Sequence, residues 1–380
     1  MYKVKTILKD IQTPCYVCEE ELLEKNLKLL NYVQQKGAIN ILLALKGFAF
    51  SPLLHLVPKY LKGCCASGLH EAKYAKEFVK GEVHTFCTAF KDSEFDEIVN
   101  LSDHIVFNSF TQLERFKDRL NSNNSVGIRI NPEVSTVEVD LYNPCGLNSR
   151  LGITKKEFEK NISNFDMIDG FHFHALCEQN VEDLKIVFDK FEQNFSQYFK
   201  DLKWLNFGGG HHITREDYDV EGLIEFLKTV KAKYPHLSIY LEPGEAVGWQ
   251  SGTLIATVLD IIHNGIDIAI LDVSAEAHMP DTLAMPYTPE VVDATIGFND
   301  KYNYRLAGNS CLAGDIIGDY SFNKKLNIGD KIIFKDQIHY TIVKNTTFNG
   351  IKLPDLGVLK KDGSFELSKE FGYNEYKNRN

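Results

Sequence analysis

The sequence lacks the features of a membrane protein, a secreted protein or a nucleic-acid-binding protein. No stretch approaches the roughly 18–20 uninterrupted apolar residues that a membrane-spanning helix needs. The N-terminal segment MYKVKTILKD has no long apolar region and no cleavage site, which argues against a secretory signal and favours the cytoplasm. The formal net charge is −10, so the chain has no basic footprint for nucleic acid. An acidic surface of this kind would attract a cationic substrate.

Disulfides and a zinc site are not expected either, although the chain contains 8 cysteines. In a chain of 380 residues without a secretory signal, reduced cysteines are the default. Cys15 and Cys18 form a C-x-x-C in a segment that reads as a strand, where an offset of three places the sulfurs on opposite faces. The adjacent Cys64 and Cys65 have the same difficulty, so we predict no metal site.

Apolar runs of strand length recur along the chain, separated by amphipathic segments with helical spacing such as 181–199 and 220–234. The predicted strands cover residues 39–45, 62–66, 82–86, 104–107, 125–130, 168–173, 202–207 and 236–242. Eight strands that alternate with helices over about 210 residues predict a (β/α)8 TIM-like barrel. We place it at residues 15–245, with a doubly wound open sheet as the competing architecture.

The pattern changes after Gly244. The stretches 252–265, 267–274 and 331–344 read as strands with no helices between them. They predict a second, mostly β domain over residues 246–380, to which residues 1–14 could add a strand. Within the barrel, residues 131–150 form a long irregular piece, and a loop of that length is usually functional or mobile.

Residues with chemical potential fall at the carboxyl ends of the predicted barrel strands, where barrels carry their active sites. In strand order these residues are Lys46, Arg129 and Asn131, His172 and His174, Gly208–Gly210, and Glu242. Taken singly, each has an ordinary explanation as a rim lysine, a core histidine, a glycine turn or a solvated acid. A lysine at the end of a core strand is nevertheless unusual. In a pocket it can lose its proton and attack a carbonyl to form a Schiff base.

The set matches what pyridoxal phosphate requires of a protein. The carbonyl needs a nucleophilic lysine, and the phosphate needs backbone N–H groups that it can approach closely. The pyridine nitrogen needs an acidic partner, and the ring face needs a flat side chain. Lys46, Gly208–Gly210, Glu242 and His174 would supply these groups in that order.

With these motifs the sequence resembles the barrel-type, pyridoxal-phosphate-dependent basic amino acid decarboxylases, the family of ornithine and diaminopimelate decarboxylases. The resemblance is carried by LALKGF, CCASGLHEA, FHFHALCE, LNFGGG, LEPGEA, NSCLAGD and HYTIVKNTTFNG, in the family's order over nearly the whole chain. It implies the alanine racemase-like fold, fold type III, in which a β domain follows the barrel.

The resemblance also implies roles for the matching residues. Lys46 would bind the cofactor covalently, His174 would stack on its ring, and Glu242 would pair with the pyridine nitrogen. Gly208–Gly210 would bind the phosphate, which Tyr340 would reach from the β domain.

Other implied roles concern the reaction and the assembly. Cys311 would reach the active site of the other subunit and protonate the carbon from which CO₂ departs. Asp315 matches the family acid that holds a substrate amine. These roles imply a homodimer with shared active sites.

Departures from the family pattern point to one of its branches. Where ornithine and diaminopimelate enzymes commonly carry Arg, LEPGEA has Glu245, and the family's Cys is followed here by Leu312 in place of an acid. The segment DVSAEAHMPDTL, residues 272–283, fits neither enzyme. These features resemble the carboxynorspermidine (carboxyspermidine) decarboxylases, a polyamine-making branch.

The resemblance implies a substrate with one amino acid head and a long tail that carries a secondary and a primary amine. Such a tail needs acids spread along the pocket. The candidates are Glu245, Asp281, Asp315 and Glu178.

Several alternatives stay open. Within the family, the chain could be a diaminopimelate or ornithine decarboxylase. A metal-dependent barrel hydrolase would use His172 and His174, which lie two apart on a strand and would point the same way. Its further ligands would be His211, His212 and Asp272, and it leaves the glycines and Glu242 unexplained. A non-enzymatic pyridoxal phosphate carrier or an alanine racemase-like enzyme would share the barrel but not the NSCLAGD motif.

Overall fold

The structure is a computed structural model that describes residues 3–285, 287–299 and 301–380. The chain divides into two compact units, and each combines stretches that are separate in sequence. The barrel unit consists of Asn26–Gly47 and Leu54–Val247. The sheet unit consists of the described residues up to Lys25, together with Phe48–Leu53 and Gly248–Asn380.

Eight parallel strands close into a barrel in chain order, and β9 pairs with β2 to complete it. The strands are β2 (Asn40–Ala44), β3 (Gly63–Ala66), β4 (Glu82–Phe86), β5 (His104–Phe107), β6 (Ser125–Arg129), β7 (Gly170–His172), β8 (Trp204–Asn206) and β9 (Ser238–Leu241). The predicted strands are confirmed, with bounds that differ by at most two residues. The open-sheet alternative is wrong.

Large rings fill part of the barrel interior. Gly127 and Gly170 make room for Trp204, because a Cβ on either glycine would lie 2.3 or 2.0 Å from the indole ring. His84 and His104 stack with ring centroids 3.8 Å apart and an interplanar angle of 12°. The barrel interior is therefore packed with side chains, and this packing gives the residues at the strand ends a rigid support.

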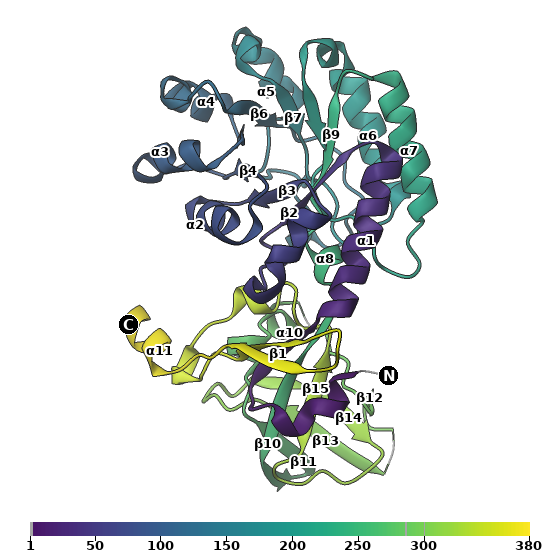
Figure 1. Ribbon diagram of the computed structural model, residues 1–380, viewed down its shortest axis with the longest axis vertical. Coiled ribbons are helices and arrows are strands. Elements are labelled where there is room, and N and C mark those ends of the chain that lie inside the picture. Colours follow the sequence, from purple (N-terminus) through teal and green to yellow (C-terminus); the bar gives the residue numbers. More distant parts are fainter. Residues whose placement is uncertain (1–2, 286, 300) are drawn as a thin grey trace. The chain divides into compact units, whose positions relative to one another are not determined.

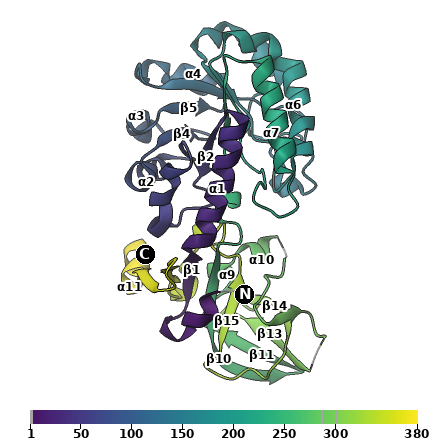
Figure 2. The ribbon, with the colours of Figure 1, turned by 45° about the vertical axis from the view of Figure 1, so that its right-hand side comes forward.

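Helices surround the barrel strands (Figure 1). The helical elements between Glu20 and Gly248 are α1 (Glu20–Gly37), η2 (Ser51–Lys59), α2 (Leu69–Tyr74), η3 (Ala75–Val79), α3 (Asp92–Leu101), α4 (Phe110–Phe116), η4 (Lys117–Arg119), α5 (Lys155–Lys160), η6 (Ile162–Met167), α6 (Val181–Phe195), η7 (Ser196–Asp201), α7 (Val220–Lys233) and α8 (Glu245–Gly248). Helices α6 and α7 lie side by side outside the barrel strands (Figure 2). Residues 131–150 are irregular as predicted, apart from the short turn η5 (Asp140–Tyr142).

The sheet unit contains a nine-stranded mixed sheet in the order β12-β14-β13-β11-β10-β1-β16-β17, with β15 also paired to β10. The strands are β1 (Cys15–Glu19), β10 (Gly252–Asn264), β11 (Ile266–Leu271), β12 (Ala294–Ile296), β13 (Tyr302–Ala307), β14 (Ile316–Phe322), β15 (Lys331–Lys335), β16 (Asp355–Leu359) and β17 (Phe365–Lys369). The helices are η1 (Lys3–Asp10), α9 (Ala275–His278), α10 (Asp281–Ala284), η8 (Ile342–Lys344), η9 (Phe348–Gly350) and α11 (Tyr373–Arg379). A mostly β second unit was predicted.

The N-terminal segment differs from the expectation. The strand that it adds to the sheet is β1, which we had placed at the start of the barrel, and β1 pairs with both β10 and β16. The 3-10 helix η1 precedes it where a strand was expected, and residues 1–2 of that segment lie outside the described residues. Val4, Ile7 and Ile11 are buried against the sheet, and this helical spacing of apolar residues explains the difference.

Each unit contains one of the two tryptophans of the chain. Trp204 is buried in the barrel, and Trp249 lies in the sheet unit with its ring centroid 5.9 Å from that of His339. None of the helices in the described part of the chain combines the length and the apolar character that crossing a bilayer requires.

Candidate active site

Lys46 lies directly beyond β2, and its Nζ is 3.5 Å from His174 Nε2. Lys46 is exposed to solvent, yet neighbouring protein atoms remove part of the hydration of its amine. The loss of hydration lowers the pKa of Lys46, and the nearby Arg129 guanidinium lowers it further, against the opposing effects of Cys65 and then Glu242. A lowered pKa increases the fraction of neutral amine, which is the nucleophilic form.

His174 is held in one orientation. Its Nδ1 accepts a hydrogen bond of 2.8 Å from the backbone N–H of Gly209, so in the neutral ring the hydrogen lies on Nε2, toward Lys46. Burial lowers the pKa of His174 well below its usual range, and the charges of Lys46 and Arg129 add to the effect. The ring is therefore a neutral, flat and oriented surface at neutral pH.

Arg129 is the last residue of β6, and its side chain contacts the backbone of His174. Its Nη2 donates to the backbone oxygen of His174 at 3.2 Å, and its guanidinium lies 4.6 Å from the centroid of the Phe86 ring. Burial lowers the pKa of Arg129 to about 10, so the group stays charged at neutral pH. From the sequence we had placed Arg129 at a strand end without a role. The sequence signal that could have revealed a role for Arg129 is that a cation rarely ends a buried strand.

Glu242 follows β9 and accepts hydrogen bonds on both oxygens. Asn206 Nδ2 donates to Oε1 at 2.7 Å, and His172 Nε2 lies 3.2 Å from Oε2. Burial alone would raise the pKa of Glu242, but the interactions with His172 and Asn206 lower it to about 2. Burial also lowers the pKa of His172, so this pair is best described as a carboxylate that accepts from a neutral imidazole.

The three glycines after β8 follow a path that side chains would block. A Cβ on Gly208, Gly209 or Gly210 would lie 2.4, 2.3 or 2.0 Å from a backbone oxygen of a neighbouring segment, and Gly208 and Gly210 have positive φ angles of 69° and 84°. The Gly208 N–H donates to Asn206 Oδ1 at 2.9 Å. The loop therefore fixes both Asn206 and His174, and its role in phosphate binding stays a prediction.

These residues fit pyridoxal phosphate in chemistry. Lys46 offers an amine with a lowered pKa, His174 offers a flat neutral ring beside it, and Glu242 offers an ionised carboxylate. One ring nitrogen of each histidine is already engaged, because His172 Nε2 lies against Glu242 and His174 Nδ1 accepts from Gly209. The arrangement therefore favours the cofactor over the metal-dependent alternative.

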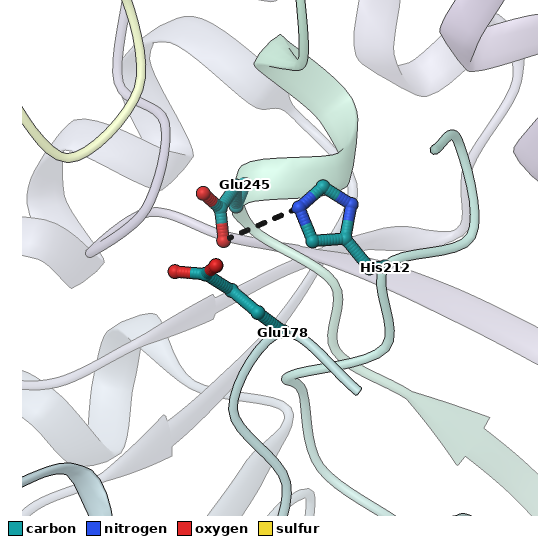
Figure 3. A group of neighbouring side chains, drawn as sticks. All are labelled: Glu178, His212 and Glu245. Carbon is teal, nitrogen blue, oxygen red and sulfur yellow. Dashed lines mark ion pairs between the residues drawn. The ribbon is translucent and has the colours of Figure 1, made fainter. Parts of the chain in front are cut away.

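A second group of side chains lies beside the glycine loop in the barrel unit. The potential ligand atoms of Glu178, His212 and Glu245 lie within 4.8 Å of one another, and Figure 3 shows the two carboxylates facing each other next to the imidazole. His212 Nε2 is 4.0 Å from Glu245 Oε2. Two carboxylates at this separation repel each other, so the group favours a cation.

The backbone holds this acidic group in place. Glu178 has a positive φ of 53°, and its backbone oxygen accepts a hydrogen bond of 3.1 Å from Arg215 Nη1. The N–H of Gln179 donates to Gly210 O at 2.9 Å, which ties this segment to the glycine loop. Glu245 begins α8. The sequence predicted both acids but not their proximity to His212.

Two other predicted residues lie in one loop of the sheet unit. Asp315 is 4% exposed and accepts hydrogen bonds from the Ala275 N–H at 2.6 Å, the Ser310 N–H at 3.1 Å and the Ser310 hydroxyl at 2.5 Å. Its carboxylate is thus engaged in folding the loop that carries Cys311. Cys311 is exposed, and its N–H donates to Asn349 Oδ1 at 2.6 Å.

The remaining predicted residues of the sheet unit are Asp281 and Tyr340. Both oxygens of Asp281 contact the ammonium of Lys344, at 2.8 and 2.7 Å. Tyr340 has a positive φ of 39° and is partly buried. The sequence offered no indication of the lysine partner.

Known proteins resemble this chain over nearly its whole length. The chain matches the family described as "Pyridoxal-dependent decarboxylase, C-terminal sheet domain" over residues 15–337. It is 53% identical to a carboxynorspermidine/carboxyspermidine decarboxylase of Campylobacter jejuni, over 97% of this chain and 99% of that one. It is 43% identical to a carboxyaminopropylagmatine decarboxylase of Synechocystis, over 98% and 96% of the two chains. A crystal structure of the Campylobacter jejuni carboxynorspermidine decarboxylase with norspermidine has a TM-score of 0.91 at 51% identity and covers 97% of this chain and 100% of that chain.

Proposed function

Because the chain belongs to the pyridoxal-dependent decarboxylase family, we propose that it decarboxylates carboxynorspermidine, carboxyspermidine or both, to give norspermidine and spermidine. The observation that carries this choice of substrate is the pair of carboxylates, Glu178 and Glu245, beside the glycine loop. Short basic amino acids carry one distal cation, whereas these substrates carry two amines along the tail. The identity to the Campylobacter jejuni enzyme supports the same substrate class.

The barrel residues would hold the cofactor and orient the substrate. Pyridoxal phosphate, when bound, supplies the electron sink for the electron pair that remains as CO₂ departs. Lys46 would hold the cofactor through its amine, whose pKa is lowered by burial and by Arg129. His174 would support the ring face. Glu242 stays ionised at neutral pH and would keep a proton on the ring nitrogen.

Glu178 and Glu245 would bind the tail of the substrate. Each carboxylate offers a charge-assisted hydrogen bond to an ammonium group. His212 lies against Glu245 and would restrict its orientation. The acids would therefore contribute to substrate affinity more than to the chemical step.

We further propose a homodimer in which Cys311 acts in the partner's active site. The hydrogen bonds of Asp315 fold the loop and leave Cys311 exposed, which suits a thiol that donates a proton across an interface. Mixing inactive Lys46→Ala and Cys311→Ala proteins should restore about a quarter of the wild-type activity, because mixed dimers would hold one complete site. Mixtures that stay inactive would refute the shared site.

The substrate assignment is tested by CO₂ release from the purified, cofactor-loaded enzyme. The panel is carboxynorspermidine, carboxyspermidine, carboxyaminopropylagmatine, meso-diaminopimelate and ornithine. We expect turnover of the first two to exceed that of the others by at least about 100-fold in kcat/KM, because only these two place a secondary and a primary amine together on the tail. Preferred turnover of carboxyaminopropylagmatine, diaminopimelate or ornithine would overturn the assignment and leave the family unchanged.

A further inference from the structure

The side chain of Asn206 joins two elements of the barrel unit that follow different strands. Asn206 is the last residue of β8 and is fully buried. Its Oδ1 accepts a hydrogen bond of 2.9 Å from the Gly208 N–H, and its Nδ2 donates at 2.7 Å to Glu242 Oε1. One amide group therefore contacts both the glycine loop and the carboxylate that follows β9.

The backbone closes the same connection. The Glu242 N–H donates to Gly208 O at 2.7 Å, so Gly208 is bonded to Asn206 through its nitrogen and to Glu242 through its oxygen. A Cβ on Gly209 would lie 2.3 Å from Glu242 O, which shows how closely the loop approaches this strand end. Asn206, Gly208 and Glu242 thus form a closed ring of three hydrogen bonds, and a shift of one member displaces the other two.

The residue type at position 206 suits these two partners. Gly208 presents an N–H and Glu242 presents a carboxylate, so the connecting group must accept on one side and donate on the other. A primary amide does both without a charge. Its orientation is fixed, because the reverse orientation would place its donor against the N–H and its acceptor against the carboxylate. An ionised aspartate would supply only the acceptor.

We propose that Asn206 is a positioning residue that holds the glycine loop and Glu242 in one mutual geometry, so that the phosphate and the ring nitrogen of the cofactor are bound together. The inference rests on the proposed function, which assigns the ring nitrogen to Glu242, and on the predicted binding of the phosphate by Gly208–Gly210. Loss of the amide would weaken the binding of both cofactor groups. Loss of the Glu242 charge would weaken the binding of the ring nitrogen alone.

The test compares three probes in titrations of the apoenzyme, each followed by the visible absorbance of the bound probe. The probes are pyridoxal phosphate, pyridoxal, which lacks the phosphate, and deazapyridoxal phosphate, in which carbon replaces the ring nitrogen. The dissociation constant of pyridoxal divided by that of pyridoxal phosphate is the phosphate ratio, and the corresponding quotient for the deaza probe is the nitrogen ratio. A general loss of stability weakens all three probes equally and leaves both ratios unchanged.

Asn206→Leu should lower both ratios by about tenfold, because neither the loop nor the carboxylate keeps its partner. Glu242→Gln should lower only the nitrogen ratio. The control is Asn124→Leu, directly before β6, which should leave both ratios unchanged. It also removes an amide that makes two hydrogen bonds, to the backbone oxygens of Val99 and Ser102.

Two results would overturn the inference. The first is that Asn206→Leu leaves either ratio at the wild-type value, and the second is that Glu242→Gln leaves the nitrogen ratio unchanged. If Asn206→Leu does not fold, Asn206→Ala repeats the measurement. Failure of both variants to fold would also overturn the inference, because the amide would then serve the barrel as a whole.

The outcome is independent of turnover. If the substrate panel fails but the two ratios respond as described, the role of Asn206 stands and the proposed substrate falls. If the panel succeeds and Asn206→Leu leaves the ratios unchanged, the proposed function stands and the role of Asn206 falls.

Discussion

In the barrel unit the candidate residues bind one another, whereas in the sheet unit they bind residues outside the candidate set. Lys46, His174 and Gly209 form one series of contacts, and Glu242 and Asn206 form a second that reaches the same glycine loop. In the sheet unit, the hydrogen bonds of Asp315 go to Ala275 and Ser310, and those of Asp281 go to Lys344.

The candidate residues of the two units are held in place in different ways. Side chains at the ends of barrel strands inherit their positions from the register of neighbouring strands, so a few hydrogen bonds suffice to orient them. The acids of the sheet unit have no such register, and their positions depend on partners from other segments, Ala275 for Asp315 and Lys344 for Asp281. We therefore expect substitutions of the strand-end residues Lys46 and Glu242 to reduce the chemistry most strongly.

The largest effect is expected from Lys46→Ala. The protein should lose the visible absorbance of the bound cofactor, and activity should fall by about 10³-fold or more, because no other described amine lies beside His174. Absorbance spectroscopy of the purified protein measures the first effect. Lys62→Ala, which removes an exposed lysine paired with Glu82, is the control and should keep the spectrum. An unchanged spectrum in Lys46→Ala would contradict the site.

A smaller loss is expected from Glu242→Gln. The substitution keeps the shape and removes the charge that His172 and Asn206 stabilise, so kcat should fall by about 100-fold. The absorbance of the bound cofactor should persist, which separates loss of chemistry from loss of cofactor. A kcat equal to that of the wild type would remove Glu242 from its role at the ring nitrogen.

An effect on affinity is expected from Glu245→Gln. KM for carboxynorspermidine should rise by about tenfold with little change in kcat, because one of the two carboxylates proposed to bind the substrate tail loses its charge. Glu225→Gln, in an exposed ion pair with Lys228 on α7, is the matched control. Loss of cofactor without a change in KM would exclude Glu245 from the substrate site. It would also weaken the contrast between the acids of the two units.

The smallest effect is expected from His104, which stacks on His84 inside the barrel and makes the stability of the fold depend on pH. Burial lowers the pKa of His104 to about 3, and the nearby His84 adds to the effect. In the unfolded chain the pKa of His104 returns to about 6.5. Between about pH 6.5 and pH 3 the unfolded chain therefore binds one more proton than the folded chain, and the free energy of unfolding falls as the pH falls. The contribution lost between pH 7 and pH 5 is about 2 kcal/mol.

Urea unfolding followed by circular dichroism at pH 7 and pH 5 measures this contribution. His104→Phe keeps a ring to stack on His84 and should show a smaller loss of stability on acidification than the wild type. Equal losses in the two proteins would show that His104 does not carry the effect.

The comparison of the units also explains which features could be predicted from the sequence and which could not. The barrel strands and the residues at their ends were predictable, because apolar runs identify strands and parallel strands gather their ends at one edge. The partners in the sheet unit were not, since Asp281 pairs with a lysine 63 residues away and Asp315 with a backbone group 40 residues away. No local pattern encodes such pairings. The N-terminal segment was misread because a short helix and a strand can bury the same few apolar residues.

The division of the two tryptophans between the units gives the protein two built-in optical probes. The indole of Trp204 is enclosed by the barrel, and that of Trp249 lies next to the imidazole of His339 in the sheet unit. In a Trp249→Phe variant, all indole fluorescence would come from the barrel, and in a Trp204→Phe variant all of it would come from the sheet unit. The emission of each variant would therefore reveal whether the two units melt together or one after the other.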